Sequence, residues 1–208
     1  MTTTIKHVFF DIGGVLGTNG WDREQRQMAI ERFHLDADEF QIRHEEMFGS
    51  LEKGMITLDE YLRFTVFDRP RDFSKEAFID FVHAQSKPFP ETIEIARAVA
   101  EGCDYWVMTL NNESDELNRY RIRTFGLDFF DAYLCSCWLG YSKPTLAFYQ
   151  RALNISQANP ESSVFIDNRE QNLVPARELG MRVIHYQSAA QLKTELRELG
   201  VKFNLQDS

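Results

Sequence analysis

Beyond residue 90 the chain alternates short apolar runs with stretches of helical spacing, and this alternation limits the fold more than any other feature. Strands are expected at 104–109, 131–136, 163–167 and 182–186, and helices at 90–101, 114–125, 144–153, 171–179 and 188–199. A first apolar run, from His7 to Phe10, stands apart from them. Strands that alternate with helices usually form a parallel sheet with helices on both faces. We therefore expect an α/β fold with an open, mostly parallel, Rossmann-like sheet.

A purely helical stretch separates the first strand from the rest. Apolar residues recur at helical spacing near 23–34, 37–49, 57–67 and 74–86, with Thr57 and Ser74 as N-caps and Glu60 at the capping-box position of the third segment. This pattern predicts a small helical cap inserted after the first strand. We expect an α/β core at residues 1–16 and 88–208 and a cap at 17–87. The loop at 14–22 and the prolines at 88 and 90 are the expected hinges.

Composition narrows the class of ligand. Lys and Arg number 23 against 32 Asp and Glu, a net charge of −9, which disfavours a nucleic-acid or membrane partner. An anionic substrate would therefore need a local cationic pocket. The first residues contain no apolar stretch of signal-peptide length before Asp11, no segment is long and apolar enough to span a membrane, and Cys103, Cys135 and Cys137 lie in or beside apolar runs. We expect a cytoplasmic protein with buried thiols, Cys135 and Cys137 sharing one face of a strand.

Polar side chains follow the expected strands. Asp11 ends the first, Thr109 with Leu110, Asn111 and Asn112 follows the second, Lys143 precedes a helix, and Asp167 with Asn168 ends the strand at 163–167. Ligands bind beyond the carboxyl ends of parallel strands, where these side chains should converge.

The residue types suit transfer of a phosphoryl group. A carboxylate such as Asp11 can attack phosphorus to form an aspartyl-phosphate. Mg²⁺ held by Asp11 and Asp167 would offset the repulsion between two anions. The hydroxyl of Thr109 and the ammonium of Lys143 can neutralise phosphoryl oxygens, and the backbone of Gly13 and Gly14 can complete an anion cradle.

Four segments resemble the motifs of the haloacid dehalogenase-like hydrolases, in the subfamily with a helical cap after the first motif and in its phosphatase-like branch. They are FFDIGGVL at 9–16, VMTLNN at 107–112, GYSKPTLAFYQRAL at 140–153 and VFIDNREQNLVPARELGMRVI at 164–184. The resemblance covers nearly the whole chain. It implies that Asp11 is the nucleophile, Thr109 the motif-two hydroxyl and Lys143 the motif-three cation. It also implies that Asp167 and the Gly13 carbonyl bind Mg²⁺.

Three positions depart from the family pattern. Gly13 stands where most phosphatases of the family carry a second Asp as general acid and base, and Asn168 replaces the second Asp of motif four. Leu110 separates Thr109 from Asn111, so either could contact phosphate. Asn168 joins Asp11, Gly13 and Asp167 as a metal-site candidate, while Gly13, Gly14, Asn111 and Arg169 are the candidates for phosphate binding.

The function predicted is Mg²⁺-dependent hydrolysis of a small phosphorylated metabolite. The alternatives are a metal-independent haloacid dehalogenase and a lapsed enzyme that serves as a binding protein. A receiver domain also uses Asp, Thr and Lys in this order, but the separation of 98 positions from Asp11 to Thr109 requires an insertion that such domains lack. His44, with Glu45 and Glu46, is either part of a specificity or metal site or, as we expect, part of a solvated polar helix face.

Overall fold

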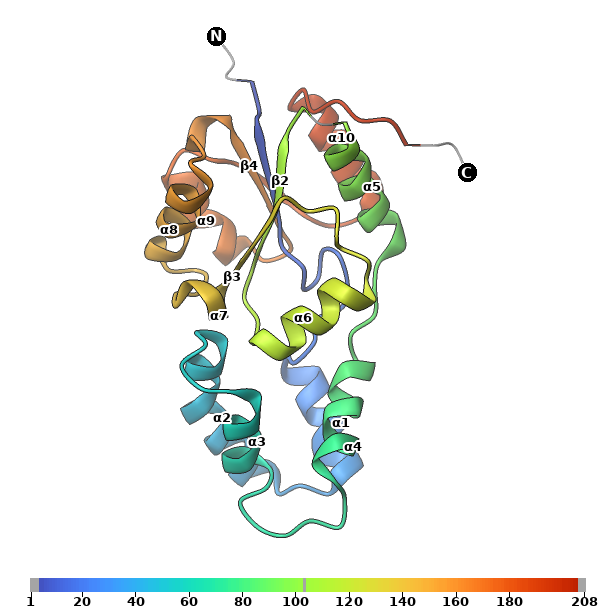
Figure 1. Ribbon diagram of the computed structural model, residues 1–208, viewed down its shortest axis with the longest axis vertical. Helices are drawn as coiled ribbons and strands as arrows, with labels where there is room; N and C mark the ends of the chain where they lie inside the picture. Colours follow the sequence, from blue (N-terminus) through green and yellow to red (C-terminus); the bar gives the residue numbers. More distant parts are fainter. Residues whose placement is uncertain (1–3, 103, 206–208) are drawn as a thin grey trace.

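A five-stranded parallel sheet forms the centre of the computed structural model, which describes residues 4–102 and 104–205. The strands are β1 (His7–Phe10), β2 (Trp106–Asn111), β3 (Ala132–Cys135), β4 (Ser163–Asp167) and β5 (Arg182–His185), in the order β3-β2-β1-β4-β5 (Figure 1). The expected open α/β sheet is confirmed. The first strand in sequence is the middle one, so the residue that follows it emerges at the centre of the sheet edge.

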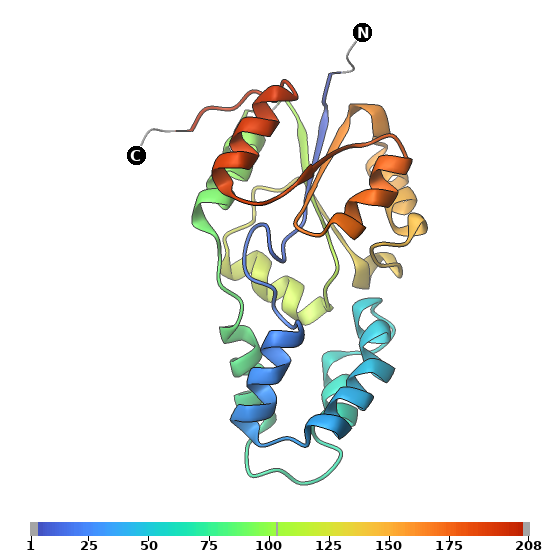
Figure 2. The ribbon, with the colours of Figure 1, turned by 180° about the vertical axis from the view of Figure 1, so that it is seen from behind.

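Two helices cover each face of the sheet. They are α8 (Leu146–Ser156) and α9 (Glu170–Glu178) on one face, and α5 (Pro90–Glu101) and α10 (Ala189–Glu198) on the other (Figures 1 and 2). Alternate residues of β1 point to opposite faces: Phe9 packs with α8 and α9, whereas Val8 and Phe10 pack with α5 and α10. β1 is therefore buried on both sides, which is why it reads as a continuous apolar run.

Two further helices lie near the carboxyl ends of the strands, α6 (Asp115–Thr124) and the four-residue α7 (Ser136–Leu139). The sequence predicts a strand to residue 136, but β3 ends at Cys135 because Ser136 begins α7. Cys137 therefore lies on a helix and not on the same strand face as Cys135, although their sulfur atoms are 3.4 Å apart. Both thiols are free, Cys135 being buried and Cys137 partly buried. Cys103 lies outside the described residues.

Four helices between β1 and α5 form a separate layer, the helical block. They are α1 (Arg23–Phe33), α2 (Ala37–Glu52), α3 (Leu58–Thr65) and α4 (Lys75–Ala84). The block has its own apolar cluster, in which Phe33 and Tyr61 are buried, and it lies beyond the carboxyl edge of the sheet (Figures 1 and 2). The predicted caps are confirmed, since the side chains of Thr57 and Ser74 accept backbone hydrogen bonds and Glu60 completes a capping box. None of the helices in the described ranges has the length and apolar character needed to cross a bilayer.

The two chain segments that join the helical block to the α/β part run side by side. The Thr18 hydroxyl donates to the Gln85 carbonyl at 2.6 Å, and the Thr18 amide donates to the Lys87 carbonyl at 2.9 Å. Gly17 forms an isolated bridge with Pro88. These contacts lie within the loop and proline segment that the sequence analysis predicts as hinges.

Candidate active site

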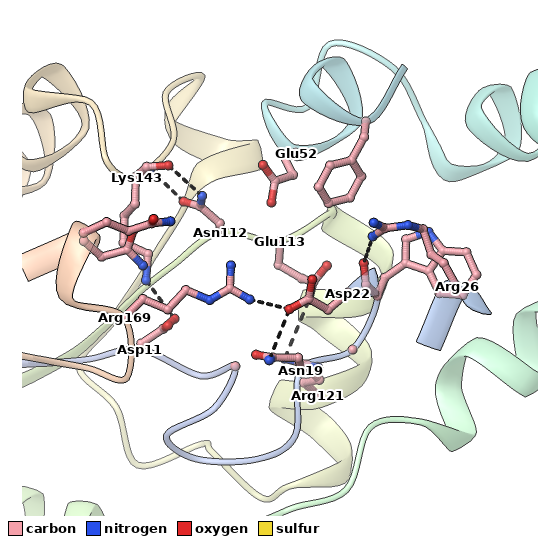
Figure 3. A pocket seen from close by; sticks show the side chains of 16 residues that line it. Asp11, Asn19, Asp22, Arg26, Glu52, Asn112, Glu113, Arg121, Lys143 and Arg169 are labelled. Atoms are coloured by element: carbon pink, nitrogen blue, oxygen red, sulfur yellow. Dashed lines mark hydrogen bonds and ion pairs between the residues drawn. The ribbon is translucent and has the colours of Figure 1, made fainter. Parts of the chain in front are cut away.

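A cavity of about 280 Å³ lies between the carboxyl edge of the sheet and the helical block (Figure 3). Trp21 and Phe48 of the helical block line this cavity and contribute apolar surface. Half of the lining residues are charged. The wall contains four acidic side chains, Asp11, Asp22, Glu52 and Glu113, and four basic ones, Arg26, Arg121, Lys143 and Arg169. Four cations therefore gather in the cavity, as an anionic substrate requires, but four carboxylates balance their charge.

Asp11 enters this cavity directly after the central strand. Its backbone N–H continues the ladder by donating to the Ile166 carbonyl at 2.9 Å, and its Oδ1 accepts from the Ile12 amide at 2.8 Å. The side chain is buried, and burial raises the pKa of Asp11 to about 7, with Lys143 lowering it and Asp167 raising it. A carboxylate at this position has one oxygen, Oδ2, with no hydrogen-bond partner among the described residues.

Lys143 bridges the carboxylates of two neighbouring strands. Its Nζ lies 2.9 Å from Asp11 Oδ1 and 2.6 Å from Asp167 Oδ2. Burial alone would lower the pKa of Lys143, but the two carboxylates outweigh it and hold that pKa above its usual value. The ammonium is thus charged and lies beside the Asp11 carboxylate at the cavity.

Asp167 lies beneath this ammonium and is fully buried. Besides Lys143 it accepts hydrogen bonds from the Arg169 amide at 2.8 Å and from Asn172 Nδ2 at 3.0 and 3.1 Å. Asp167 does not line the cavity, whereas Arg169 and Asn172 do. In this arrangement Asp167 orients Lys143 and the Arg169 loop.

The predicted motif-two residues do not reach the cavity. Thr109 is completely buried, and its hydroxyl has no hydrogen-bond partner among the described residues. Asn111 points away and donates to Asn118 at 2.9 Å. Asn112 lines the cavity instead, and its amide holds the Lys143 backbone through hydrogen bonds of 2.8 and 3.1 Å. We therefore replace Thr109 and Asn111 with Asn112, because successive side chains alternate in direction and the cavity begins only after β2 ends.

Of the two glycines of the first loop, only Gly13 lines the cavity. Gly14 has a φ of 81°, and a Cβ there would lie 2.2 Å from Asn168 Nδ2. Gly14 and Asn168 therefore pack against each other outside the cavity wall. The backbone of Gly13 is not in the left-handed region, so its conformation does not require glycine. A side chain there would instead be crowded, because a Cβ would lie 3.1 Å from Asn19 Oδ1.

Arg169 reaches the cavity, as predicted, but its guanidinium forms an ion pair with Asp22 of the helical block. Both side chains are partly exposed. This pair crosses from the α/β part to the block at the rim of the cavity (Figure 3). A substrate phosphate entering here would compete with Asp22 for Arg169.

His44 is not part of a solvated face. It is buried in the helical block, where its Nδ1 lies 2.8 Å from the Tyr61 hydroxyl. Burial lowers the pKa of His44 to about 4, so it is neutral at physiological pH. The expectation of a solvated His44 is wrong, because the helix turns this position toward the aromatic cluster.

Three cavity carboxylates, Asp22, Glu52 and Glu113, were not predicted. Glu113 follows Asn112, accepts from the Ser114 amide at 3.1 Å and lies 3.6 Å from Arg121 Nη1. Glu52 is the last residue of α2 and belongs to none of the motifs. Its position in sequence carried no signal of function, whereas the run of polar residues after β2 could have pointed to Glu113.

The oxygens that face this edge suit a hard divalent cation. Asp11 Oδ2 and the Gly13 carbonyl are available at the cavity, whereas Asn168 Oδ1, a buried acceptor without a hydrogen-bond partner among the described residues, lies outside the cavity wall against Gly14. No group of three or more His, Cys, Asp and Glu side chains gathers as a metal cluster within residues 4–102 and 104–205. The donors present thus fit Mg²⁺, which commonly uses one or two carboxylates and keeps several waters.

Comparisons with known proteins show the family of this chain. The model of the haloacid dehalogenase-like hydrolase family matches residues 5–180, and the chain belongs to this family. A sesquiterpene phosphatase of Aspergillus oryzae, astK, is 25% identical over 202 residues, which are 96% of this chain and 98% of that protein. The chain is therefore a hydrolase of this family with a phosphatase among its relatives.

Solved structures of other proteins share the fold of this chain. A family enzyme from Bacteroides thetaiotaomicron, solved in complex with magnesium and inorganic phosphate, has a TM-score of 0.72 at 24% identity, covering 88% of this chain and 94% of its own. The L-2-haloacid dehalogenase of Xanthobacter autotrophicus, with chloropropionic acid covalently bound, has a TM-score of 0.59 at 19% identity, covering 96% and 85%. At these identities the likeness concerns the fold.

Proposed function

We propose that this protein hydrolyses phosphate monoesters of small metabolites through an aspartyl-phosphate on Asp11. The observation that carries the proposal is the Asp11–Lys143–Asp167 arrangement at the centre of the sheet edge, opening on a cavity with four basic side chains. A nucleophilic carboxylate next to a fixed ammonium is what attack on an anionic phosphoryl group requires. Residues 17–87 act as the cap that selects the substrate.

Each side chain has a separate role in this proposal. Asp11 attacks phosphorus, and Lys143 neutralises the charge that builds on the phosphoryl oxygens. Asn112 holds the Lys143 backbone in place, and Asp167 orients its ammonium. Arg169 provides a second cation at the rim.

Mg²⁺ is the cofactor we propose, with Asp11 and the Gly13 carbonyl as ligands at the cavity and Asn168 and Asp167 near them. When bound, it would offset the repulsion between the nucleophilic carboxylate and the substrate phosphate. Asp167 already accepts three donors, so its contribution is mainly to hold Lys143 and the Arg169 loop.

The test is phosphate release from p-nitrophenyl phosphate and from a panel of sugar, nucleotide and hydroxy-acid phosphates, with Mg²⁺ and with excess chelator. We expect modest turnover that the chelator abolishes. Asp11→Asn should reduce turnover to background while the protein stays folded, because the amide keeps the shape but is a far weaker nucleophile. Retention of more than a few per cent of the activity by folded Asp11→Asn would exclude a covalent intermediate on Asp11.

Haloacid dehalogenation is the second candidate, since the fold is shared with such enzymes and Gly13 supplies no carboxylate. In that reaction Asp11 attacks carbon and halide leaves without a proton. Chloride release from 2-chloropropionate that continues in chelator, with no phosphate release from any ester, would support it. Binding of phosphorylated ligands without turnover of either substrate class would identify a lapsed enzyme.

A further inference from the structure

Cleavage of an alkyl phosphate leaves a strongly basic oxygen that needs a proton, and the chain must supply the donor. Asp11 is committed to phosphorus in the proposed reaction. Gly13, two residues further on, has no side chain. The donor must therefore come from another part of the cavity wall.

Among the remaining carboxylates of the cavity, two are engaged. Asp22 is partly exposed and paired with Arg169. Glu113 accepts a backbone hydrogen bond from Ser114 and lies 3.6 Å from the Arg121 guanidinium, so its carboxyl group already faces two donors; burial raises its pKa, and these two contacts oppose the rise. The third, Glu52, has no hydrogen-bond or ion-pair partner for its carboxyl group among the described residues.

Glu52 belongs to the helical block, yet its backbone is held by the α/β part. The Ser136 hydroxyl donates to the Glu52 carbonyl at 2.6 Å and itself accepts from the Glu113 amide at 3.0 Å. Figure 3 shows the side chain descending from the block into the cavity that Asp11 lines from the sheet edge. This anchoring fixes the backbone of a residue whose side chain lines the same cavity as Asp11.

The surroundings of Glu52 favour a carboxyl group that holds a proton near neutrality. Burial, followed by the neighbouring Glu113, raises the pKa of Glu52 to about 7, while Lys143, Arg169 and Lys53 oppose the rise. A general acid works best when its pKa is close to the working pH. Glu52 can therefore both give and take a proton there.

We propose that Glu52 is the catalytic acid and base of this hydrolase, which rests on the function proposed above. As Asp11 Oδ forms its bond to phosphorus and the ester P–O bond breaks, the Glu52 carboxyl transfers its proton to the leaving oxygen and the alcohol departs. Water then attacks the aspartyl-phosphate, and the Glu52 carboxylate takes its proton. The P–O bond to Asp11 breaks, which releases phosphate and restores both side chains.

The experiment compares an alkyl ester, glycerol phosphate, with an activated aryl ester, p-nitrophenyl phosphate, in wild type and in Glu52→Gln. The aryl leaving group hardly needs a proton. We expect kcat/KM for the alkyl ester to fall by about 10²–10⁴ in Glu52→Gln and for the aryl ester by less than about tenfold. Glu46→Gln, an exposed residue on the same helix, is the matched control and should change neither.

The pH profile gives a second readout. Above about pH 7 the wild-type rate on the alkyl ester should decline as Glu52 loses its proton, and the aryl rate should decline less. Glu52→Gln should lose this difference in slope. If Glu52→Gln does not fold, the divergence of the two wild-type profiles decides the matter alone.

The outcomes separate the two proposals. Equal losses on both esters in folded Glu52→Gln, or parallel wild-type profiles above pH 7, would overturn the role of Glu52 and leave the phosphatase intact. A wild-type protein that hydrolyses neither ester nor any phosphate of the panel overturns the proposed function and the role of Glu52 with it.

Discussion

At the candidate site, Lys143 is the residue that joins the two acidic strand ends through its ammonium group. It is almost completely buried and lies within 3 Å of two carboxylates on neighbouring strands, Asp11 and Asp167. Burying ions is costly, and removal of one partner leaves the others without compensation. The same ammonium that would stabilise a phosphoryl group therefore also holds the two strand ends together.

Lys143→Met should abolish turnover and lower the free energy of unfolding by about 3–5 kcal/mol at pH 7. Without the ammonium the pKa of Asp11, already raised by burial to about 7, rises further. A raised pKa in the folded state gives stability that is present at low pH and lost as the pH rises. Denaturant titrations should thus show a smaller deficit at pH 5 than at pH 8.

Lys202→Met, at an exposed position, is the control and should change the free energy of unfolding by less than about 0.5 kcal/mol. If the loss of unfolding free energy in Lys143→Met instead grew as the pH falls, Lys143 would not stabilise the protein by compensating the charge of these carboxylates.

At the scale of elements, the turn after α2 fits tightly against α7. Gly54 has a φ of 66°, and a Cβ there would lie 2.1 Å from the Cys137 carbonyl oxygen. The Leu58 amide adds a hydrogen bond to Glu116 of α6 at 3.0 Å. This contact fixes the end of α2, and therefore Glu52, relative to the sheet edge.

Gly54→Ala should displace the turn and lower both stability and turnover. Left-handed backbone alone costs a non-glycine residue about 1–2 kcal/mol, and the clash with Cys137 adds to that. Gly200→Ala is the matched control, because Gly200 has a φ of 82° and open space around its Cβ. Melting temperatures and alkyl phosphatase rates should fall further for Gly54→Ala. Equal melting temperatures and unchanged turnover would show that the turn yields without moving Glu52.

Over the whole molecule, the helical block is joined to the α/β part by two chain segments, and Arg121 of α6 ties them together. Its guanidinium donates to the Thr18 carbonyl at 2.8 Å and to the Ser86 hydroxyl at 3.2 Å, and lies 3.6 Å from Glu113. Arg121 is 2% exposed. One buried cation thus connects both hinge segments and the cavity wall.

Arg121→Met should cost about 3–5 kcal/mol of unfolding free energy, because the buried Glu113 loses its nearby cation and two hinge groups lose a donor. Arg119→Met, on the exposed face of the same helix, should cost less than about 1 kcal/mol although its ion pair with Asp115 is lost. Urea denaturation measures both. A similar cost for the two variants would mean that Arg121 packs as a long side chain without bracing the hinge.

The sheet, the helical block and three side chains that meet at the sheet edge could be predicted from the sequence. Strand and helix have different apolar periods, and these survive in the sequence because the strands are buried on both faces. Asp11, Lys143 and Asp167 could be predicted because the ends of parallel strands meet at one edge whatever the details of packing.

The tertiary structure decided what lies opposite those residues. Asn112, and not Thr109 or Asn111, lines the cavity. The direction of a side chain at the end of a strand depends on the register and on the residue at which the strand stops. Sequence periodicity leaves that residue uncertain by one position or more. Glu52 and Arg121 enter the site through the packing of α2 and α6 against the sheet edge. That packing depends on shape and on long-range contacts, such as Gly54 against Cys137, that no local pattern in the sequence encodes.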